Sequence, residues 1–143
     1  MPKILIDTSI IIDFLRQKDK SKTLLYFFGQ HQYQIYISII THAESYAGRS
    51  VWERKEAMEI LEKLLSNFKI LPLEEAISKK AGQINAIYHN MEIVDAIIAQ
   101  TAISHKLELA TLNIKDFEKI KGIKLFKLWY LNKYTKEPRN PEV

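Results

Sequence analysis

Short apolar runs alternate with longer stretches of helical periodicity along the chain. Runs rich in β-branched and aromatic residues predict strands at 3–7, 34–38, 68–73, 107–111 and 124–128. Between them, apolar residues that recur every three or four positions predict helices at 10–16, 21–28, 41–48, 52–66, 74–88, 91–105 and 113–119. Strands that alternate with helices favour a parallel sheet with right-handed crossovers. We therefore expect an α/β fold, a three-layer α/β/α sandwich around a central, mostly parallel, five-stranded sheet.

Small polar residues stand where several of these helices are expected to begin. Thr8 or Ser9 is suited to cap the helix at 10–16, and Thr41 the helix that carries Glu44. These caps place the start of each helix directly after a predicted strand.

The length of 143 residues predicts one domain, which we place at 1–130, followed by a loose basic tail at 131–143. The chain contains no cysteine, which excludes a disulfide framework, a thiolate zinc site and a cysteine nucleophile. Asp7 and Asp13 interrupt the apolar start, so we do not expect a secretory signal. No apolar run approaches membrane-spanning length, and we expect a cytoplasmic protein without a membrane partner.

The charge is unevenly distributed. Lys and Arg number 21 against 17 Asp and Glu, and residues 115–139 alone carry a net charge of +5. Such a segment can attract a polyanion such as a nucleic acid. A solvated lysine-rich surface is the plainer interpretation, and charge by itself favours it.

Four acidic residues interrupt apolar segments near the predicted carboxyl ends of strands. Asp7 ends the first strand, Glu44 lies on the helix after the second, and Asp116 follows the fourth. Asp95 lies near the start of an almost wholly apolar helix. In an open parallel sheet the carboxyl ends of the strands line one crevice where ligands bind. The spacing therefore predicts that these carboxylates lie near one another.

Several charged carboxylates can share a crevice only if a cation neutralises them, because repulsion otherwise raises their pKa values. Oxygen ligands without cysteine suit Mg²⁺ or Mn²⁺. In phosphodiester cleavage such ions polarise the phosphoryl oxygen and help to generate hydroxide. The acids and the basic segment together predict metal-dependent cleavage of a nucleic acid.

Each acid also has a structural interpretation. Asp7 could simply cap a helix, Glu44 could be a surface residue, and Asp95 could be a cap beside Val94. Asp116 could be a first-turn acid favoured by the helix dipole. Four unrelated structural roles would not explain why all four acids stand at matching places relative to the strands, whereas one shared site explains it.

Other enzyme classes lack their motifs here. The chain has no G-x-S-x-G elbow, P-loop or G-x-G-x-x-G segment, and no two histidines have zinc-ligand spacing. A haloacid-dehalogenase phosphatase needs a second Asp where this chain has Ser9. A phosphoacceptor receiver domain needs adjacent acids near its N-terminus, and this chain has none there.

Four motifs in order resemble the PIN domain, most closely its branch of VapC-type toxins. The resemblance covers residues 3–128 and rests on Ile-Asp-Thr-Ser at 6–9, Ile-Thr-His-Ala-Glu at 40–44, Asp-Ala-Ile-Ile-Ala at 95–99 and Ala-Thr-Leu-Asn-Ile-Lys-Asp-Phe at 110–117. The four acids are separated by 37, 51 and 21 positions. Each motif alone is weak, and their order and spacing make the resemblance specific.

The resemblance implies a Mg²⁺- or Mn²⁺-dependent endoribonuclease with an RNA substrate. Asp7, Glu44 and Asp95 would be the core metal ligands and catalytic acids, with Asp116 as a more variable fourth. The hydroxyls of Thr8, Ser9 and Thr111 would orient acids or water. Asn113 stands where many members have Asp, so either Asn113 or Asp116 could serve as the fourth ligand.

The same resemblance implies two protein partners, a second copy of the chain in a homodimer and a small antitoxin. The alternative from another functional class is a catalytically silent RNA-binding or protein-interaction module on the same fold. Intact acids at Asp7, Glu44 and Asp95 speak against that alternative, because a silent site has no need for repelling charges.

Overall fold

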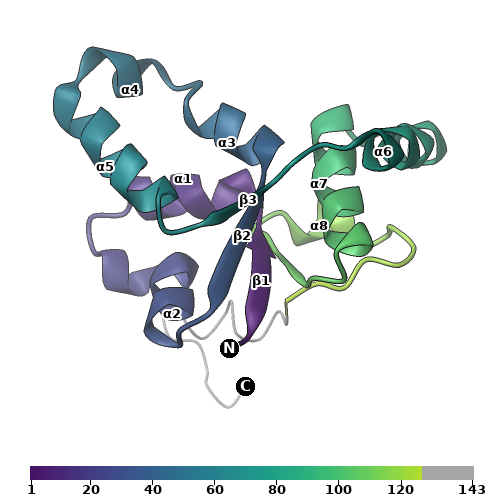
Figure 1. Ribbon diagram of the computed structural model, residues 1–143, viewed down its shortest axis with the longest axis horizontal. Coiled ribbons are helices and arrows are strands. Elements are labelled where there is room, and N and C mark those ends of the chain that lie inside the picture. The colour runs from purple at the N-terminus through teal and green to yellow at the C-terminus, as the bar shows by residue number, and fades with distance from the viewer. Residues whose placement is uncertain (127–143) are drawn as a thin grey trace.

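We describe the fold from a computed structural model, in which residues 1–126 are described (Figure 1). The elements in chain order are β1 (Lys3–Ile6), α1 (Thr8–Arg16), the 3₁₀ helix η1 (Lys20–Lys22), α2 (Leu24–Gln30), β2 (Gln34–Ser38), α3 (Ile39–Ser45), α4 (Arg49–Glu53), α5 (Lys55–Leu65), β3 (Lys69–Leu71), α6 (Glu75–Ile87), α7 (Ile93–Ser104), β4 (Leu109–Ala110) and α8 (Ile114–Phe117). Strands and helices alternate as the sequence predicts.

The sheet is parallel and has the strand order β3-β2-β1-β4. It has four strands, so the prediction of a fifth strand at 124–128 is wrong for the described part of that segment. Leu125 forms only an isolated parallel bridge with Leu109. The Leu109 N–H donates to the Lys124 carbonyl, and the Phe126 N–H donates to the Leu109 carbonyl, both at 2.8 Å. Because β4 is only two residues long, it offers no room for a longer ladder.

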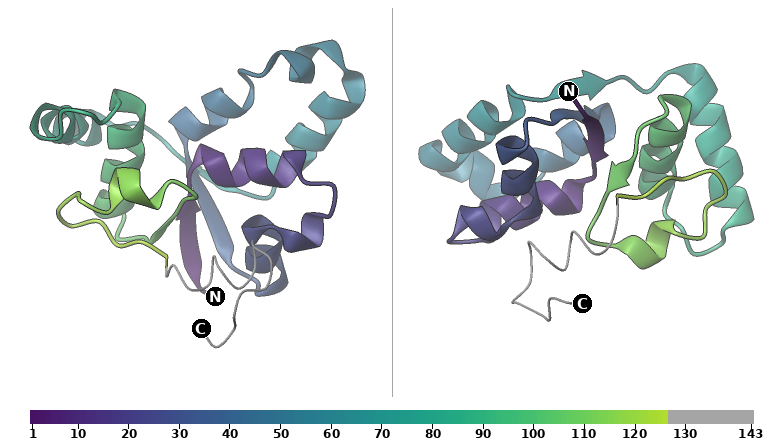
Figure 2. Two further views of the ribbon diagram at one scale, coloured as in Figure 1. Left: turned by 180° about the vertical axis from the view of Figure 1, so that it is seen from behind. Right: turned by 90° about the horizontal axis from the view of Figure 1, so that it is seen from below.

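Helices cover both faces of the sheet and make three layers (Figure 1). Along β1, Ile4 and Ile6 are buried against α1, α2 and α5, whereas Leu5 is buried against α6 and α7. This alternation follows from the two-residue period of a strand. Figure 2 shows the same arrangement from behind and from below, with α6 and α7 on the opposite side of the sheet from α1 and α2. The predicted three-layer sandwich is confirmed.

Two predicted helices are each divided. The segment 21–28 forms η1 and then α2, because the Thr23 hydroxyl accepts a hydrogen bond from the Tyr26 N–H (3.2 Å) and starts a new helix. The segment 52–66 forms part of α4 and then α5, because Arg54 is extended (φ −121°, ψ 120°). Helical periodicity alone did not reveal the change of direction at Arg54.

The helix caps differ from those expected. Asp7 caps α1 in place of Thr8 or Ser9, and Ser38 caps α3 in place of Thr41. In both cases the last polar residue before the helix takes the cap, which moves the start of the helix closer to the strand. Thr41 is fully buried inside α3.

Residues 1–126 build one set of layers around one sheet. The predicted tail at 131–143 and the last residues of the predicted domain lie outside the described residues. No helix within residues 1–126 is long and apolar enough to cross a membrane.

Candidate active site

The carboxyl edge of the sheet carries the side chains that the sequence singles out. Asp7 directly follows β1, Thr111 directly follows β4, and Glu44 lies on α3, which begins where β2 ends. Asp95 lies in the first turn of α7, and Asp116 lies in the first turn of α8. A parallel sheet brings these chain segments to one edge, as the ligand crevice of such folds requires.

Asp7 is the most constrained of the four acids. Its side chain is 4% exposed, and its Oδ1 accepts hydrogen bonds from the Ser9 N–H (3.0 Å) and the Ser9 hydroxyl (2.5 Å). Its Oδ2 accepts a hydrogen bond from the Thr111 hydroxyl (2.5 Å). Burial raises the pKa of Asp7, and these hydrogen bonds from Ser9 and Thr111 oppose the rise. The carboxylate is thus both a helix cap and a fixed oxygen donor at the crevice.

Glu44 is exposed and is oriented by a hydroxyl from another element. The Thr8 hydroxyl donates a hydrogen bond to Glu44 Oε1, and Thr8 Oγ1 lies 3.2 Å from Thr41 Oγ1. Thr41 lies one helical turn before Glu44, so both side chains are on the same side of α3. The contact joins the start of α1 to α3 and holds Glu44 over the carboxyl edge.

The pKa of Asp95 depends on the charges of the other acids. Its pKa is raised to about 6, first by burial and then by the charges of Asp7, Asp116, Glu92 and Glu44, in that order. Each of these carboxylates is therefore close enough to repel a negative charge on Asp95. The structure brings all four predicted acids into one electrostatic cluster.

Asp116 and Asn113 sit at the exposed rim of this cluster. The Asn113 N–H donates to Thr111 Oγ1 (3.0 Å), and the Leu112 N–H donates to Ser9 Oγ (3.0 Å). These bonds fix the loop between β4 and α8 against the start of α1. Thr8, Ser9 and Thr111 thus donate hydrogen bonds to acids of the cluster, and Asn113 contributes its backbone N–H to the same network.

Sequence analysis missed two polar residues of this site. Glu92 adds negative charge beside Asp95, and Thr41 contacts Thr8. Both lie three positions before a predicted acid, Glu92 before Asp95 and Thr41 before Glu44, a spacing that places helical residues on one face. That spacing was the signal that could have found them.

A divalent cation suits the chemistry of this cluster. The donors are carboxylate oxygens without cysteine, as Mg²⁺ and Mn²⁺ require. Burial raises the pKa of Asp95 most, and the negative charges of Asp7, Asp116, Glu92 and Glu44 raise it further, so a nearby cation would favour the charged carboxylate. The distances between the side chains are too long for direct binding as they stand. Within residues 1–126, no three His, Asp or Glu side chains lie close enough together to hold one ion. That all four acids bind a common ion stays a prediction.

The raised pKa of Asp95 predicts how stability depends on pH in the metal-free protein. Between its ordinary pKa of 3.8 and about 6, folded Asp95 retains a proton that the unfolded chain has released. Folding therefore loses stability as pH rises through this window. We expect Asp95→Asn to raise the melting temperature at about pH 7.5 and to change it much less at about pH 4. Thermal denaturation followed by circular dichroism tests this, and an equal shift at both pH values would contradict it.

The sequence is similar to those of proteins of one known family. A sequence model of the PIN domain family matches residues 4–123. The chain belongs to the PIN domain family. Ribonuclease VapC1 of Rickettsia felis is 35% identical over 130 residues, covering 85% of this chain and 93% of that protein. Ribonuclease VapC1 of Methanocaldococcus jannaschii is 33% identical over 130 residues, covering 87% of each. These relatives confirm the predicted VapC branch.

Solved structures give the same fold. A toxin–antitoxin complex from Klebsiella pneumoniae has a chain with a TM-score of 0.65 and 30% identity, covering 84% of this chain and 94% of that one. DNA-bound VapBC from Salmonella typhimurium gives a TM-score of 0.72 at 24% identity, covering 88% and 98% of the two chains. At that identity the second likeness shows the fold alone.

Proposed function

We propose that this protein is a metal-dependent endoribonuclease and the toxin of a toxin–antitoxin pair. The observation that carries the proposal is the placement of Asp7, Glu44, Asp95 and Asp116 at the carboxyl edge of the sheet. Burial, and then the charges of the other acids, raise the pKa of Asp95 there. The relatives from Rickettsia felis and Methanocaldococcus jannaschii are both ribonucleases VapC1, which supports RNA as the substrate.

In this proposal Asp7, Glu44 and Asp95 hold Mg²⁺, for which Mn²⁺ can substitute, and Asp116 or Asn113 completes the set. Such an ion would polarise a phosphoryl oxygen and favour hydroxide formation from water. The protein's own hydroxyls prepare the acids: Ser9 and Thr111 fix Asp7, and Thr8 orients Glu44. These hydrogen bonds hold Asp7 and Glu44 at the carboxyl edge in advance, and the acids would still have to move closer together to share one cation.

A silent RNA-binding or interaction module is the second candidate. One observation favours it, namely that no three acidic or histidine side chains in residues 1–126 stand in position to hold one ion. RNA binding without cleavage, unchanged by Mn²⁺ or EDTA, would support this candidate over the nuclease.

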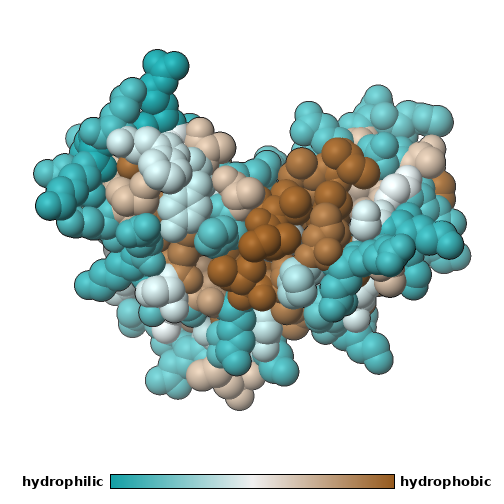
Figure 3. All heavy atoms as spheres, turned by 45° about the horizontal axis from the view of Figure 1, so that its top comes forward, coloured by the Kyte–Doolittle hydropathy of each residue, from teal (hydrophilic) through white to brown (hydrophobic). Residues whose placement is uncertain are grey.

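The proposed partners are a small antitoxin and a second copy of the chain. The similar chain from Klebsiella pneumoniae, at 30% identity, belongs to a toxin–antitoxin complex, which supports an antitoxin partner. Figure 3 presents a face with apolar surface gathered in its hollowed middle. Ile39, at the start of α3, and Ile93, at the start of α7, are among the exposed large apolar side chains. Such surface is typical of protein contacts. The cytoplasmic location stays a prediction.

A cleavage assay tests the function. Purified protein is incubated with a mixed-sequence RNA, the same sequence as DNA, and RNA in a perfect duplex, each with Mg²⁺, Mn²⁺ or EDTA. We expect internal cuts in RNA only when a divalent cation is present. Binding without any cleavage under every metal condition would reject the endoribonuclease.

Substitutions at the rim of the cluster are expected to lower the cleavage rate less than substitutions at its centre. Asp116→Asn should lower the cleavage rate less than Asp7→Asn, because Asp116 is exposed whereas Asp7 is buried and held by three hydrogen bonds. An alanine at Asn113 should also be mild, because Asn113 contacts Thr111 through its backbone N–H. Mn²⁺ titrations of the variants check the order, and an equal loss of metal affinity at Asp7 and Asp116 would refute it.

A further inference from the structure

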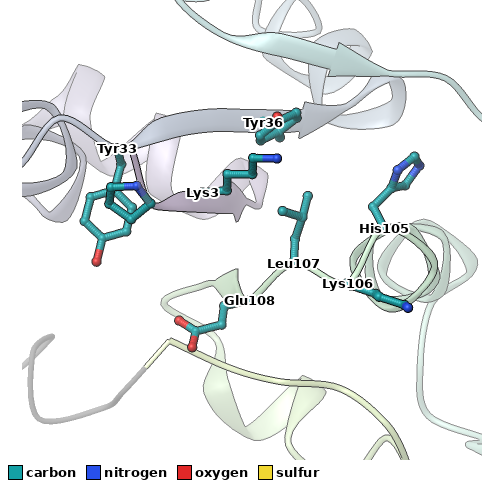
Figure 4. Close-up of a pocket in the computed structure, with 8 residues that line it drawn as sticks. Lys3, Tyr33, Tyr36, His105, Lys106, Leu107 and Glu108 are labelled. Carbon is teal, nitrogen blue, oxygen red and sulfur yellow. The ribbon is translucent and has the colours of Figure 1, made fainter.

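A pocket lies at the amino ends of the strands and has a different lining from the carboxylate cluster. It has a volume of about 530 Å³ and is lined by Pro2, Lys3, Tyr33, Tyr36, His105, Lys106, Leu107 and Glu108 (Figure 4). Lys3 begins β1, and Asp7 directly follows the end of β1. Asp7 lies four positions after Lys3 along the chain, which corresponds to about 13 Å in an extended strand. The pocket is therefore separate from the carboxylate cluster and lies at the opposite end of the sheet.

The lining of this pocket is basic. Lys3, His105 and Lys106 line it together with one acid, Glu108. Lys69 adds a fourth basic residue nearby, because it pairs with Tyr36 across β2 and β3 and leaves the sheet on the same face. Within residues 1–126 neither Lys3 nor Lys106 has a carboxylate at ion-pairing distance. In Figure 4 the Glu108 carboxylate points away from the Lys3 ammonium group. Unpaired positive charge of this kind suits an anion.

The middle of the pocket is apolar and aromatic. Tyr36 is half-buried and packs on the core that α6 and α7 share with the sheet. Its ring stands beside the Lys3 side chain, and Leu107 projects into the space below them (Figure 4). An aromatic ring next to a lysine is a combination that holds a base and its phosphate, because bases stack on aromatic rings and lysines bind phosphates.

The end of α7 does not oppose an anion here. A helix C-terminus is normally unfavourable to negative charge, because its last carbonyls are unpaired. In this structure the Leu107 N–H donates to the Ala102 carbonyl (2.9 Å) and the Lys106 N–H donates to the Ile103 carbonyl (3.1 Å). Lys106 reaches this turn with a φ of 57°, a conformation that favours glycine. These two bonds occupy the Ala102 and Ile103 carbonyls, so these carbonyls do not repel an anion. His105 lines the pocket, whereas the Lys106 side chain points away from Lys3 and Tyr36 (Figure 4).

We propose that this pocket binds a nucleotide, with its phosphate on Lys3, assisted by His105, and its base against Tyr36. The ligand is either a free nucleotide or one nucleotide of an RNA strand, since both present the same base and phosphate. The proposal does not depend on the chemistry of the carboxylate cluster, and binding here should persist in a protein that cannot cleave RNA.

Binding of ADP to the full chain tests the proposal by calorimetry and by NMR shifts, with inorganic phosphate as the anion-only probe. We expect saturable ADP binding that perturbs Tyr36 and His105, and weaker binding of phosphate alone. Lys3→Gln should weaken ADP binding about tenfold or more, as the loss of a charge-assisted hydrogen bond would. Glu108→Gln should strengthen it about two- to fivefold by removing a like charge.

The matched control is Lys80→Gln, which removes an exposed lysine of α6 that does not line the pocket. Absence of saturable ADP binding, or equal weakening by Lys3→Gln and Lys80→Gln, would overturn the proposal. A single-stranded oligoribonucleotide added to the Asp7→Asn protein identifies the source of the ligand. Displacement of ADP by the oligonucleotide supports a nucleotide within an RNA strand, and retention of ADP supports a free nucleotide. Loss of RNA cleavage with ADP binding intact would concern the carboxylate cluster alone.

Discussion

Asp7→Asn is expected to lower the rate of RNA cleavage by about a thousandfold or more, the size of effect that follows from losing several kcal/mol of electrostatic stabilisation. Asp7 is the buried acid of the cluster, and Ser9 and Thr111 fix its two oxygens. An amide in its place removes one negative charge and one oxygen donor.

The fold should survive this substitution. Asn is as good a helix cap as Asp, so the hydrogen bond from the Ser9 N–H to residue 7 is retained. The Thr111 hydroxyl can accept a hydrogen bond from the new amide in place of donating one. Circular dichroism and the melting temperature check the fold, and initial rates on a labelled RNA measure the activity.

The chain contains a matched control for this experiment. Asp19 caps η1 and accepts hydrogen bonds from the Ser21 N–H (3.1 Å) and hydroxyl (2.6 Å), in the same pattern that Asp7 makes with Ser9. Asp19→Asn therefore repeats the local chemistry away from the cluster and should leave cleavage unchanged. Wild-type cleavage by the Asp7→Asn protein would refute the role of Asp7.

The second large effect is expected from the divalent cation. Removing it with EDTA should abolish cleavage, and adding Mn²⁺ to metal-free protein should raise the melting temperature. A ligand at a hundred times its dissociation constant stabilises a folded protein by about 2.7 kcal/mol. The physical reason is that a cation neutralises the mutual repulsion that raises the pKa of Asp95.

Ionic strength must be separated from specific binding, because salt also screens repelling charges. NaCl matched to the ionic strength of the Mn²⁺ sample is the control for the wild-type protein. The double variant Asp7→Asn, Asp95→Asn should lose the specific effect of Mn²⁺ and keep the effect of salt. Equal melting shifts from Mn²⁺ and NaCl in the wild-type protein would contradict a specific metal site.

Much of the fold could be predicted because its strands are short and strongly patterned. The runs at 3–7 and 34–38 became β1 and β2 with nearly the expected limits. The predicted fifth strand failed because its apolar run has the right composition, while its partner β4 offers only two paired residues. Strand length in a sheet depends on the neighbouring strand, and that neighbour lies far away in sequence.

The sequence predicts which acids lie at the site, but not which side chains hydrogen-bond to them. The position of each acid after a strand or at a helix start was enough to place Asp7 and Asp95 at one edge. The partner of each acid was not evident, because the hydrogen bond from Thr111 to Asp7 joins residues 104 positions apart. The dual role of Asp7, as cap and site residue, also shows that the two interpretations of one residue need not exclude each other.

The central claim is that the acids at the carboxyl edge hold one divalent cation. Anomalous diffraction from a crystal soaked in Mn²⁺ locates such an ion directly. The account predicts a Mn²⁺ peak within bonding distance of Asp7 and Asp95 carboxylate oxygens, about 2.0–2.6 Å for hard divalent cations. A crystal with Mn²⁺ bound only elsewhere, or with none at this edge at saturating concentration, would contradict it.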